Sequence, residues 1–394
     1  MIRYALGIVA PTLMTLYNID PKTMGYILSG WNWAYTGALP FVGPVVDRFG
    51  PWITMGAGTM VWGVSTVALP IATGAASLFA MRFLFGFGHS MLIPTTATSV
   101  SRRFPVRERT RAISVAFSGN QVGLAVGATV ATFIMSKFGW PSVFYFLGGL
   151  TLLLGLAWFL FFPDKGIGKA SGPTPDQTST LNEPHIPWAS LLTYRSTWGI
   201  AFGQFGYLYA YYFFISWLPT YLIRERHMTV LATGIFAALP FWIGMLATLG
   251  GGWLGDYLIA RGVSTTVSRK SIIGFGLSSS TVFVVAAAYV DTGIVAAILV
   301  TLSIGFMRLA TGSANSLPID LAPRSAVGRL TSIQNFFGNT GGLLAPIVTG
   351  YIVGATGSFV YALVTAGGMA LFGAISYVFI VGNLETGRIQ PRAT

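Results

Sequence analysis

Long apolar runs, separated by short polar stretches, dominate the chain. A helix needs about 20 apolar residues to cross the hydrocarbon core of a bilayer, so such runs are typical of membrane-spanning helices. They predict spans at 24–46, 51–71, 77–99, 111–135, 140–162, 197–222, 230–255, 271–290, 293–316, 326–354 and 358–382. The pattern therefore predicts an all-α integral membrane protein.

A shorter apolar run opens the chain. It extends from Tyr4 only to Leu16, which is too short for a helix that spans a bilayer. It lacks the basic flank and the cleavage site of a secretory signal peptide. We expect it to be the second half of a first transmembrane helix that begins upstream of Met1, and a short interfacial segment is the alternative.

Composition supports the membrane assignment and divides the chain. Of the 394 residues, 53% are hydrophobic and 9% are charged, whereas soluble domains carry about 25% charged residues. Residues 163–195 form the long polar stretch, whose Pro, Gly, Ser and Thr content predicts a linker. We expect an N-terminal bundle at 1–162 and a C-terminal bundle at 196–394. The chain has no cysteine, which excludes disulfides and thiolate metal sites.

The positions of the cations predict the orientation. If the opening run counts as helix 1 and the N-terminus is cytoplasmic, 16 of the 23 Lys and Arg fall in cytoplasmic loops or in the tail. This bias agrees with the positive-inside rule, and leaving out helix 1 would reverse it. The linker is then cytoplasmic. Because the net charge of +12 lies mainly in these short loops, it does not indicate nucleic-acid binding.

Three short motifs recur in the same order in both halves of the chain. They are Gly43–Asp47 and Gly252–Asp256 (both Gly-x-x-x-Asp), Pro105 and Pro323 six residues before an arginine, and Gly-Asn-x-x-Gly from Gly119 and from Gly338. In each case the second copy follows the first at a similar distance along the chain. The motifs indicate two homologous six-helix halves, an architecture of transporters that bind their substrate near the bilayer midplane.

The segment GPVVDRFGP resembles the loop motif of the major facilitator superfamily, although Pro51-Trp52 departs from its end. The resemblance implies a gating motif in which the aspartate caps a helix terminus and pairs with a basic group of helices 4 and 11. Its residues here are Gly43, Asp47, Arg48 and Gly50, with Asp256 as the counterpart in the second half. A solvated turn is the alternative.

Longer segments, among them MGYILSGWNWAYTGALPFVGPVVDRFG, RFLFGFGHSMLIP and RRFPVRERTRAISVAFSGNQVGLA, resemble the anion:cation symporter family. The resemblance covers essentially the whole chain, and members of that family include bacterial galactonate and hexuronate carriers. It implies a twelve-helix fold of two pseudo-symmetric bundles, alternating access around a central cavity, and a multi-pass location in a cell membrane, namely the inner membrane in a bacterium. It also places Arg3 midway along helix 1, where the family carries Asp-Arg.

Three arginines then lie at membrane depth, namely Arg3, Arg82 and Arg308. Each costs roughly 2.5–3.5 kcal/mol at the bilayer centre unless it is paired or hydrated. All 11 Asp and Glu fall in predicted loops, in the linker or in the tail. A water-filled cavity visited by an anionic substrate would resolve this imbalance, because a guanidinium binds a carboxylate through two parallel hydrogen bonds.

Polar side chains accompany these arginines at helical spacing, for example Thr311 and Asn315 after Arg308. The predicted substrate-binding residues are Arg3, Tyr35, Asn120, Arg308, Asn315 and Asn335. Among them, Asn120 and Asn335 match amide positions of the family in helices 5 and 11. Amides also bridge membrane helices, so a structural role stays open for such residues.

The coupling site departs from the family. Ile2 replaces the acid of helix 1, and His89 replaces a glutamate that resembles a proton carrier, seven residues after Arg82. Histidine has an ordinary pKa near 6.5 and can carry a proton, so His89 and Arg82 form the predicted coupling pair. Arg82 also begins an Arg-x-x-x-Gly motif that is common in the superfamily, so a structural role for it stays open. A neutral, hydrogen-bonding His89 is equally compatible with the sequence, as is anion exchange or uniport without a proton site.

Other classes of function fit less well. With three histidines, no cysteine and no acid at membrane depth, the chain offers no nucleophile–base pair, so we predict no enzyme and no cofactor. A facilitator of neutral sugars or drugs is the nearest rival. The predicted partners are a small organic anion, protons if transport is coupled, and the lipid bilayer, around a monomer.

Overall fold

The computed structural model describes residues 2–103, 106–161 and 188–386, and every regular element in these ranges is helical. Eight helices of the described part are long and apolar enough to cross a membrane. The helices are α1 (Ile2–Leu16), α2 (Pro21–Val67), α3 (Ala75–Ser90), α4 (Leu92–Arg103), α5 (Val106–Phe138), α6 (Trp140–Phe161), α8 (Trp188–Leu191), α9 (Arg195–Arg224), α10 (Val230–Ala260), α11 (Thr265–Tyr289), α12 (Gly293–Leu309), α13 (Thr311–Leu321), α14 (Arg324–Thr356) and α15 (Val360–Ile375). A 3-10 turn, η1 (Leu69–Ile71), follows α2, and a π-helical turn, η2 (Ser376–Ile380), extends α15.

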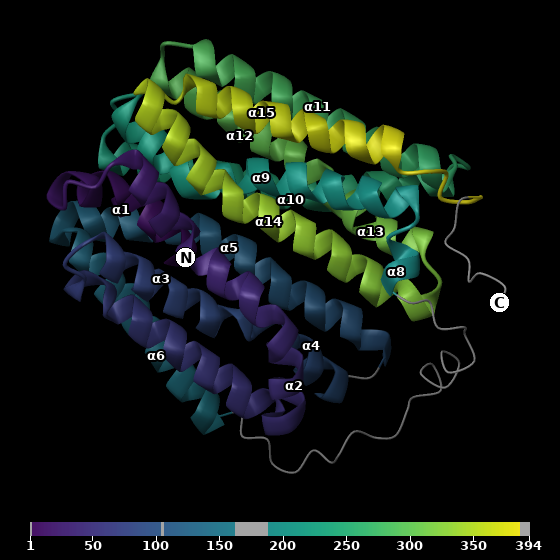
Figure 1. Cartoon of the computed structure of the whole chain (residues 1–394), viewed down its shortest axis with the longest axis horizontal. Coiled ribbons are helices and arrows are strands. Elements are labelled where there is room, and N and C mark those ends of the chain that lie inside the picture. Colours follow the sequence, from purple (N-terminus) through teal and green to yellow (C-terminus); the bar gives the residue numbers. More distant parts are fainter. Residues whose placement is uncertain (1, 104–105, 162–187, 387–394) are drawn as a thin grey trace. The chain divides into compact units, whose positions relative to one another are not determined.

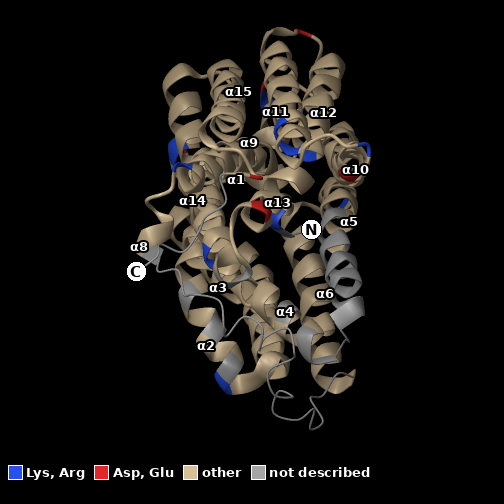
Figure 2. Ribbon diagram, turned by 90° about the vertical axis from the view of Figure 1, so that its right-hand side faces the viewer, with Lys and Arg blue, Asp and Glu red and all other residues tan. Residues whose placement is uncertain are grey.

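The described helices reproduce the predicted spans closely. Most of each helix is free of charge, as the tan ribbons of Figure 2 show. One differing boundary is explained by a cap: α11 starts at Thr265, before the predicted position 271, because the Ser264 side chain accepts a hydrogen bond from the backbone of Val267. One helical turn, α8, also lies inside the predicted linker, whose residues 163–187 are outside the described part.

Helix α2 contains two predicted spans. Its dihedral angles leave the helical region at Gly50, where φ is +79°. Only glycine adopts this left-handed conformation without a steric cost, so Gly50 ends one limb of α2 (residues 21–49) and starts the next (residues 51–67). The backbone conformation at this position therefore explains why the predicted gating motif has a glycine there.

Two predicted spans are each broken into two helices. The span at 77–99 divides at Met91 into α3 and α4, and the span at 293–316 divides at Ala310 into α12 and α13. Met91 and Ala310 are separated along the chain by the same offset as the two Gly-Asn-x-x-Gly motifs. The fourth helix of each predicted half therefore breaks at the same place.

The chain forms two compact units. The first consists of residues 1–170, 214–239 and 346–359, and in it α2 packs against α3, α4 and α6, while α1 packs against α5. The second consists of residues 171–213, 240–345 and 360–394. In it α11 packs against α12, α13 and α15, and α11 and α15 run side by side in Figure 1. The predicted bundle boundaries at 162 and 196 stay a prediction.

Candidate functional site

Close backbone packing positions α3 between the two limbs of α2. A side chain at Gly86 would overlap the carbonyl oxygen of Trp31 on the first limb. A side chain at Gly88 would lie 2.6 Å from the carbonyl oxygen of Gly58 on the second limb. Small residues allow such approaches between membrane helices. As a result, the residue that follows, His89, is held between both limbs.

His89 lies in a cage of four aromatic rings, which we call the His89 cage. Its imidazole stacks on Trp62 at 4.9 Å and on Trp31 at 6.2 Å between ring centroids. Tyr35 and Phe85 approach it edge-on, both at 5.8 Å. The side chain is 5% exposed, and its Nδ1 atom has no hydrogen-bond partner in the described part of the chain.

Two arginines adjoin the His89 cage. Arg82 lies seven residues before His89 on the same helix, is 1% exposed, and places its Cζ atom 5.1 Å from the centre of the Phe85 ring. Its Nε atom has no hydrogen-bond partner among the described residues. Arg3 of α1 lies over Trp31 at the same distance. The structure thus brings two predicted substrate-binding residues, Arg3 and Tyr35, next to the predicted coupling pair of Arg82 and His89.

The described carboxylates lie at the ends of helices. Asp20 caps α2, and hydrogen bonding from the side chain and the backbone of Thr23 lowers the pKa of that carboxyl. Glu225 accepts hydrogen bonds from the hydroxyl of Ser358 and the backbone of Phe359, at the start of α15. The other described carboxylates are Asp256, Asp291, Asp320 and Glu385, in or beside the connections between helices or in the C-terminal segment. This distribution agrees with the prediction that acids avoid the membrane core.

The second unit contains its own polar cluster around Arg308, near the C-terminus of α12. The Arg308 Nη1 atom donates a hydrogen bond of 3.1 Å to the hydroxyl of Tyr207, which shares another of 2.8 Å with Thr311. The guanidinium carbon lies 5.2 Å from the centre of the Tyr211 ring, and Tyr211 stacks on Tyr207. We call these four residues the Arg308 cluster.

The Arg308 cluster and the His89 cage occupy equivalent places in the two repeats. His89 and Arg308 are separated along the chain by the same offset as Met91 and Ala310, so each comes two residues before the break of its helix. The same backbone position therefore carries a permanent cation in one half and a titratable imidazole in the other.

The remaining predicted polar residues belong to neither the His89 cage nor the Arg308 cluster. Asn315 and Asn335 are exposed, and the amide of Asn335 donates back to the carbonyl of Thr331 on its own helix. A further amide, Gln204 of α9, joins two helices, since it accepts a short hydrogen bond of 2.6 Å from Tyr377 of η2. The side chain of Asn120 lies outside those that the structure describes.

The predicted gating residues are only partly described. Gly43 and the side chain of Asp47 lie outside the described residues, and Arg48 is exposed. The counterpart Asp256 lies 3.8 Å from Nη1 of Arg269 at the start of α11. Arg269 also contacts Asp320 at 3.3 Å, so one arginine links two helix ends.

The sequence indicates only some of the aromatic residues that surround Arg308 and His89. Tyr207 and Tyr211 have a detectable signal, because they lie four residues apart on one helix face. Trp31, Trp62 and Phe85 have none, because aromatic residues are common throughout such helices. Their role becomes visible only when three helical segments are placed around His89.

Comparisons with known proteins agree with the resemblance seen in the sequence. Residues 1–267 match the family model of the Major Facilitator Superfamily. The chain is 30% identical to the probable galactarate/D-glucarate transporter GudP of Escherichia coli (strain K12), over 99% of this chain and 92% of that protein. It is also 30% identical to a hexuronate transporter of Bacillus subtilis (strain 168), over 96% and 90% of the two chains.

A solved structure shares the fold. It is a bacterial homologue of the human lysosomal transporter Spinster, with a TM-score of 0.76, 15% sequence identity, and coverage of 96% of this chain and 90% of that one. At this identity the similarity concerns the fold alone. The predicted all-α membrane fold is thereby confirmed, as is the predicted resemblance to sugar-acid carriers.

Proposed function

The chain belongs to the Major Facilitator Superfamily of membrane transporters, and we propose that it carries organic acid anions, of the sugar-acid class, by alternating access. It is a multi-pass membrane protein and not an enzyme. Two relatives that it matches over nearly their whole length are named for galactarate, D-glucarate and hexuronate, which are all sugar acids. These names support the substrate class as a whole.

The observation that carries the proposal is the burial of Arg82 beside Arg3 and the His89 cage. A guanidinium that is 1% exposed must be balanced by charge or by hydrogen bonds, because an unpaired buried charge is strongly destabilising. The described carboxylates lie at helix ends instead. A carboxylate that arrives with the substrate would balance this cationic region for part of each transport cycle.

The Arg308 cluster suits the same substrate class. The hydroxyl of Tyr207, a buried residue, accepts a hydrogen bond from Arg308 and so orients the guanidinium. Hydroxyl groups and stacked rings nearby match the hydroxyls and the apolar ring or chain face of a sugar acid. We infer that Arg308 binds a substrate oxygen.

Uptake into vesicles tests the substrate class. Proteoliposomes with the purified full chain are given labelled D-glucarate, D-glucuronate and D-glucose side by side. We expect saturable uptake of an acid and none of glucose. Arg3→Ala and Arg308→Ala should abolish acid uptake while the protein still inserts, whereas Arg224→Ala, at an exposed helix end, should not. Normal uptake by both variants, or uptake of glucose alone, would contradict the proposal.

We further propose that His89 carries the coupled proton. The aromatic faces around it attract an imidazolium, while the positive charges of Arg3 and Arg82 oppose its formation. A bound carboxylate would cancel that opposition. Because Nδ1 has no hydrogen-bond partner in the described part, a proton there breaks no such bond. By linkage, substrate and proton then strengthen each other's binding equally.

His89→Gln separates coupling from transport. We expect this variant to exchange labelled for unlabelled substrate at a near-normal rate but to lose accumulation driven by a pH gradient. His89→Glu, which restores an acid, should recover some accumulation. Undiminished uphill uptake by His89→Gln under a proton gradient would refute this role and favour exchange or another coupling ion.

A further inference from the structure

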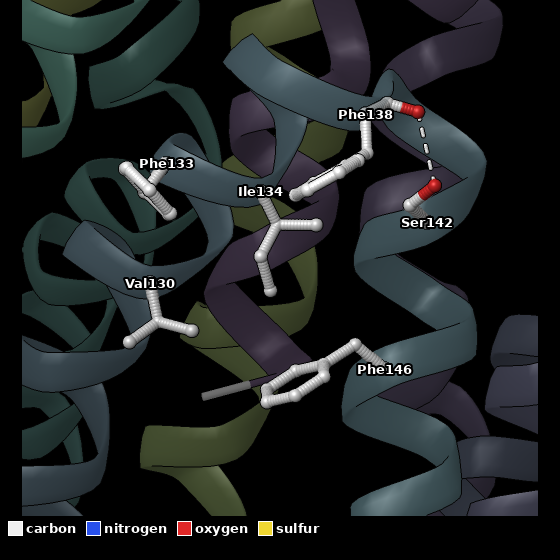
Figure 3. A pocket seen from close by; sticks show the side chains of 6 residues that line it. All are labelled: Val130, Phe133, Ile134, Phe138, Ser142 and Phe146. Atoms are coloured by element: carbon white, nitrogen blue, oxygen red, sulfur yellow. Dashed lines mark hydrogen bonds between the residues drawn. The ribbon is translucent and has the colours of Figure 1, made fainter.

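A groove of about 400 Å³ lies between α5 and α6 and shares no residue with the His89 cage or the Arg308 cluster. It is lined by Val130, Phe133, Ile134, Phe138, Ser142 and Phe146, and Figure 3 shows Ile134 of α5 and Phe146 of α6 pointing into the space between the two helices. All three of its rings are strongly exposed: Phe133 and Phe146 at 52% each and Phe138 at 69%. In a membrane protein, such exposed rings face hydrocarbon.

The groove offers no free hydrogen-bonding group to a polar ligand. The hydroxyl of Ser142, its one polar side chain, donates a hydrogen bond of 2.9 Å to the carbonyl oxygen of Phe138, drawn as a dashed line in Figure 3. All other lining side chains are hydrocarbon. A sugar acid would lose its hydration here without replacement, so the groove suits an alkyl chain.

The position of the groove matches one leaflet of a bilayer. From Val130 to Phe138, α5 rises by about 12 Å, and half of the hydrocarbon core measures about 15 Å. At Gly139, where φ is +80°, the chain turns and continues into α6. The groove therefore begins at the end of two membrane helices and extends inward by about the depth of one leaflet.

A cation and an indole lie at the open end. Lys137 follows Val130 by seven residues and Ile134 by three, so it shares their helix face, and it is exposed. Trp140 stands just beyond the turn, and tryptophans favour the membrane interface. An exposed ammonium at this level attracts anionic headgroups.

We propose that this groove binds one acyl chain of an anionic phospholipid, whose headgroup phosphate lies at Lys137. A second copy of the chain is the competing occupant. Six residues line the groove, whereas a stable protein interface uses about 20–30 residues on each side. The charge at the mouth and the apolar interior together match a lipid better.

Photolabelling of the full chain in nanodiscs tests the site. The discs contain equal amounts of phosphatidylglycerol and phosphatidylethanolamine, and a photoreactive acyl chain is placed on one lipid or the other. We expect the phosphatidylglycerol probe to label Phe133, Phe138 and Phe146 more than Phe379 of η2. Phe379 is a matched reference, because it is 69% exposed, like Phe138.

Two pairs of variants sharpen the result. Lys137→Gln should reduce the preference for phosphatidylglycerol about fivefold, whereas Arg224→Gln, which removes an exposed cation from another helix, should leave it unchanged. Gly149→Leu places a side chain on the face that Ser142 and Phe146 share, and it should reduce labelling of the groove by both probes. Gly368→Leu on α15 is its control, since a Cβ atom at either glycine meets nothing within 4 Å.

Three outcomes would overturn the proposal. Labelling of Phe138 no stronger than that of Phe379 would indicate ordinary lipid contact. An unchanged lipid preference in Lys137→Gln would remove the headgroup contact. Crosslinks between two copies of the chain at Phe133, in place of lipid adducts, would identify a protein neighbour instead.

Discussion

The substitution Tyr207→Phe tests whether the Arg308 cluster binds substrate. It removes one hydroxyl that joins Arg308 and Thr311, at 3.1 and 2.8 Å, and keeps the ring that stacks on Tyr211. Tyr207 is a positioning residue in this scheme, because it acts on the substrate through the guanidinium. Without the hydroxyl, the guanidinium loses one hydrogen bond that orients it.

The expected size follows from the hydrogen bond that is lost. Bonds to charged groups contribute about 1.5–3 kcal/mol, and Arg308 is only partly buried, so we use the lower end of that range. Since about 1.4 kcal/mol corresponds to a factor of ten in an equilibrium constant, KM should rise about tenfold. The maximal rate should change much less, because the lost hydrogen bond is expected to act on substrate binding.

Initial rates of acid uptake into proteoliposomes over a range of substrate concentrations provide the measurement. Tyr209→Phe is the matched control, because Tyr209 is buried two residues further along α9 and its hydroxyl has no hydrogen-bond partner in the described part. That control should keep its KM. Equal KM values for Tyr207→Phe and Tyr209→Phe would show that the Arg308 cluster is structural and does not contact the substrate.

Two further predictions concern stability. Asp320→Asn should lower the free energy of unfolding by about 1–2 kcal/mol, because Arg269 contacts Asp320 at 3.3 Å in a partly buried pair. Asp256→Asn should lower it by about 0–0.5 kcal/mol, because Asp256 lies 3.8 Å from Arg269 and its side chain is 78% exposed. A larger loss of thermal stability in Asp256→Asn would contradict this order. Gly86→Ala should prevent the folding of the first unit, since the added methyl group overlaps a backbone oxygen. Gly37→Ala should fold normally, because a methyl group there meets nothing within 4 Å. Monodisperse Gly86→Ala protein with a normal melting temperature would show that α3 can move away from α2.

The sequence alone determined which segments are helices and roughly where each one lies. Hydropathy is a local property of the chain, and a bilayer permits only internally hydrogen-bonded helices to cross it, so runs of apolar residues suffice to locate the spans. The position of Gly50 in a loop motif between two spans also indicated a turn, and the positive φ of this residue forms that turn. The repeated motifs also predicted that the two halves are equivalent, and the helix breaks at Met91 and Ala310 agree with this.

Tertiary structure decided which residues serve each cation. The sequence selected Arg82 and Arg308 because charge at membrane depth is rare, and it selected His89 because this residue replaces a glutamate of the resembling family. Neither criterion needs a partner. Nothing local distinguishes Trp31 and Trp62 from the other tryptophans, yet these two enclose His89 because Gly86 and Gly88 let both limbs of α2 approach α3. Choosing such partners depends on contacts between distant segments, and those contacts arise only when the helices pack.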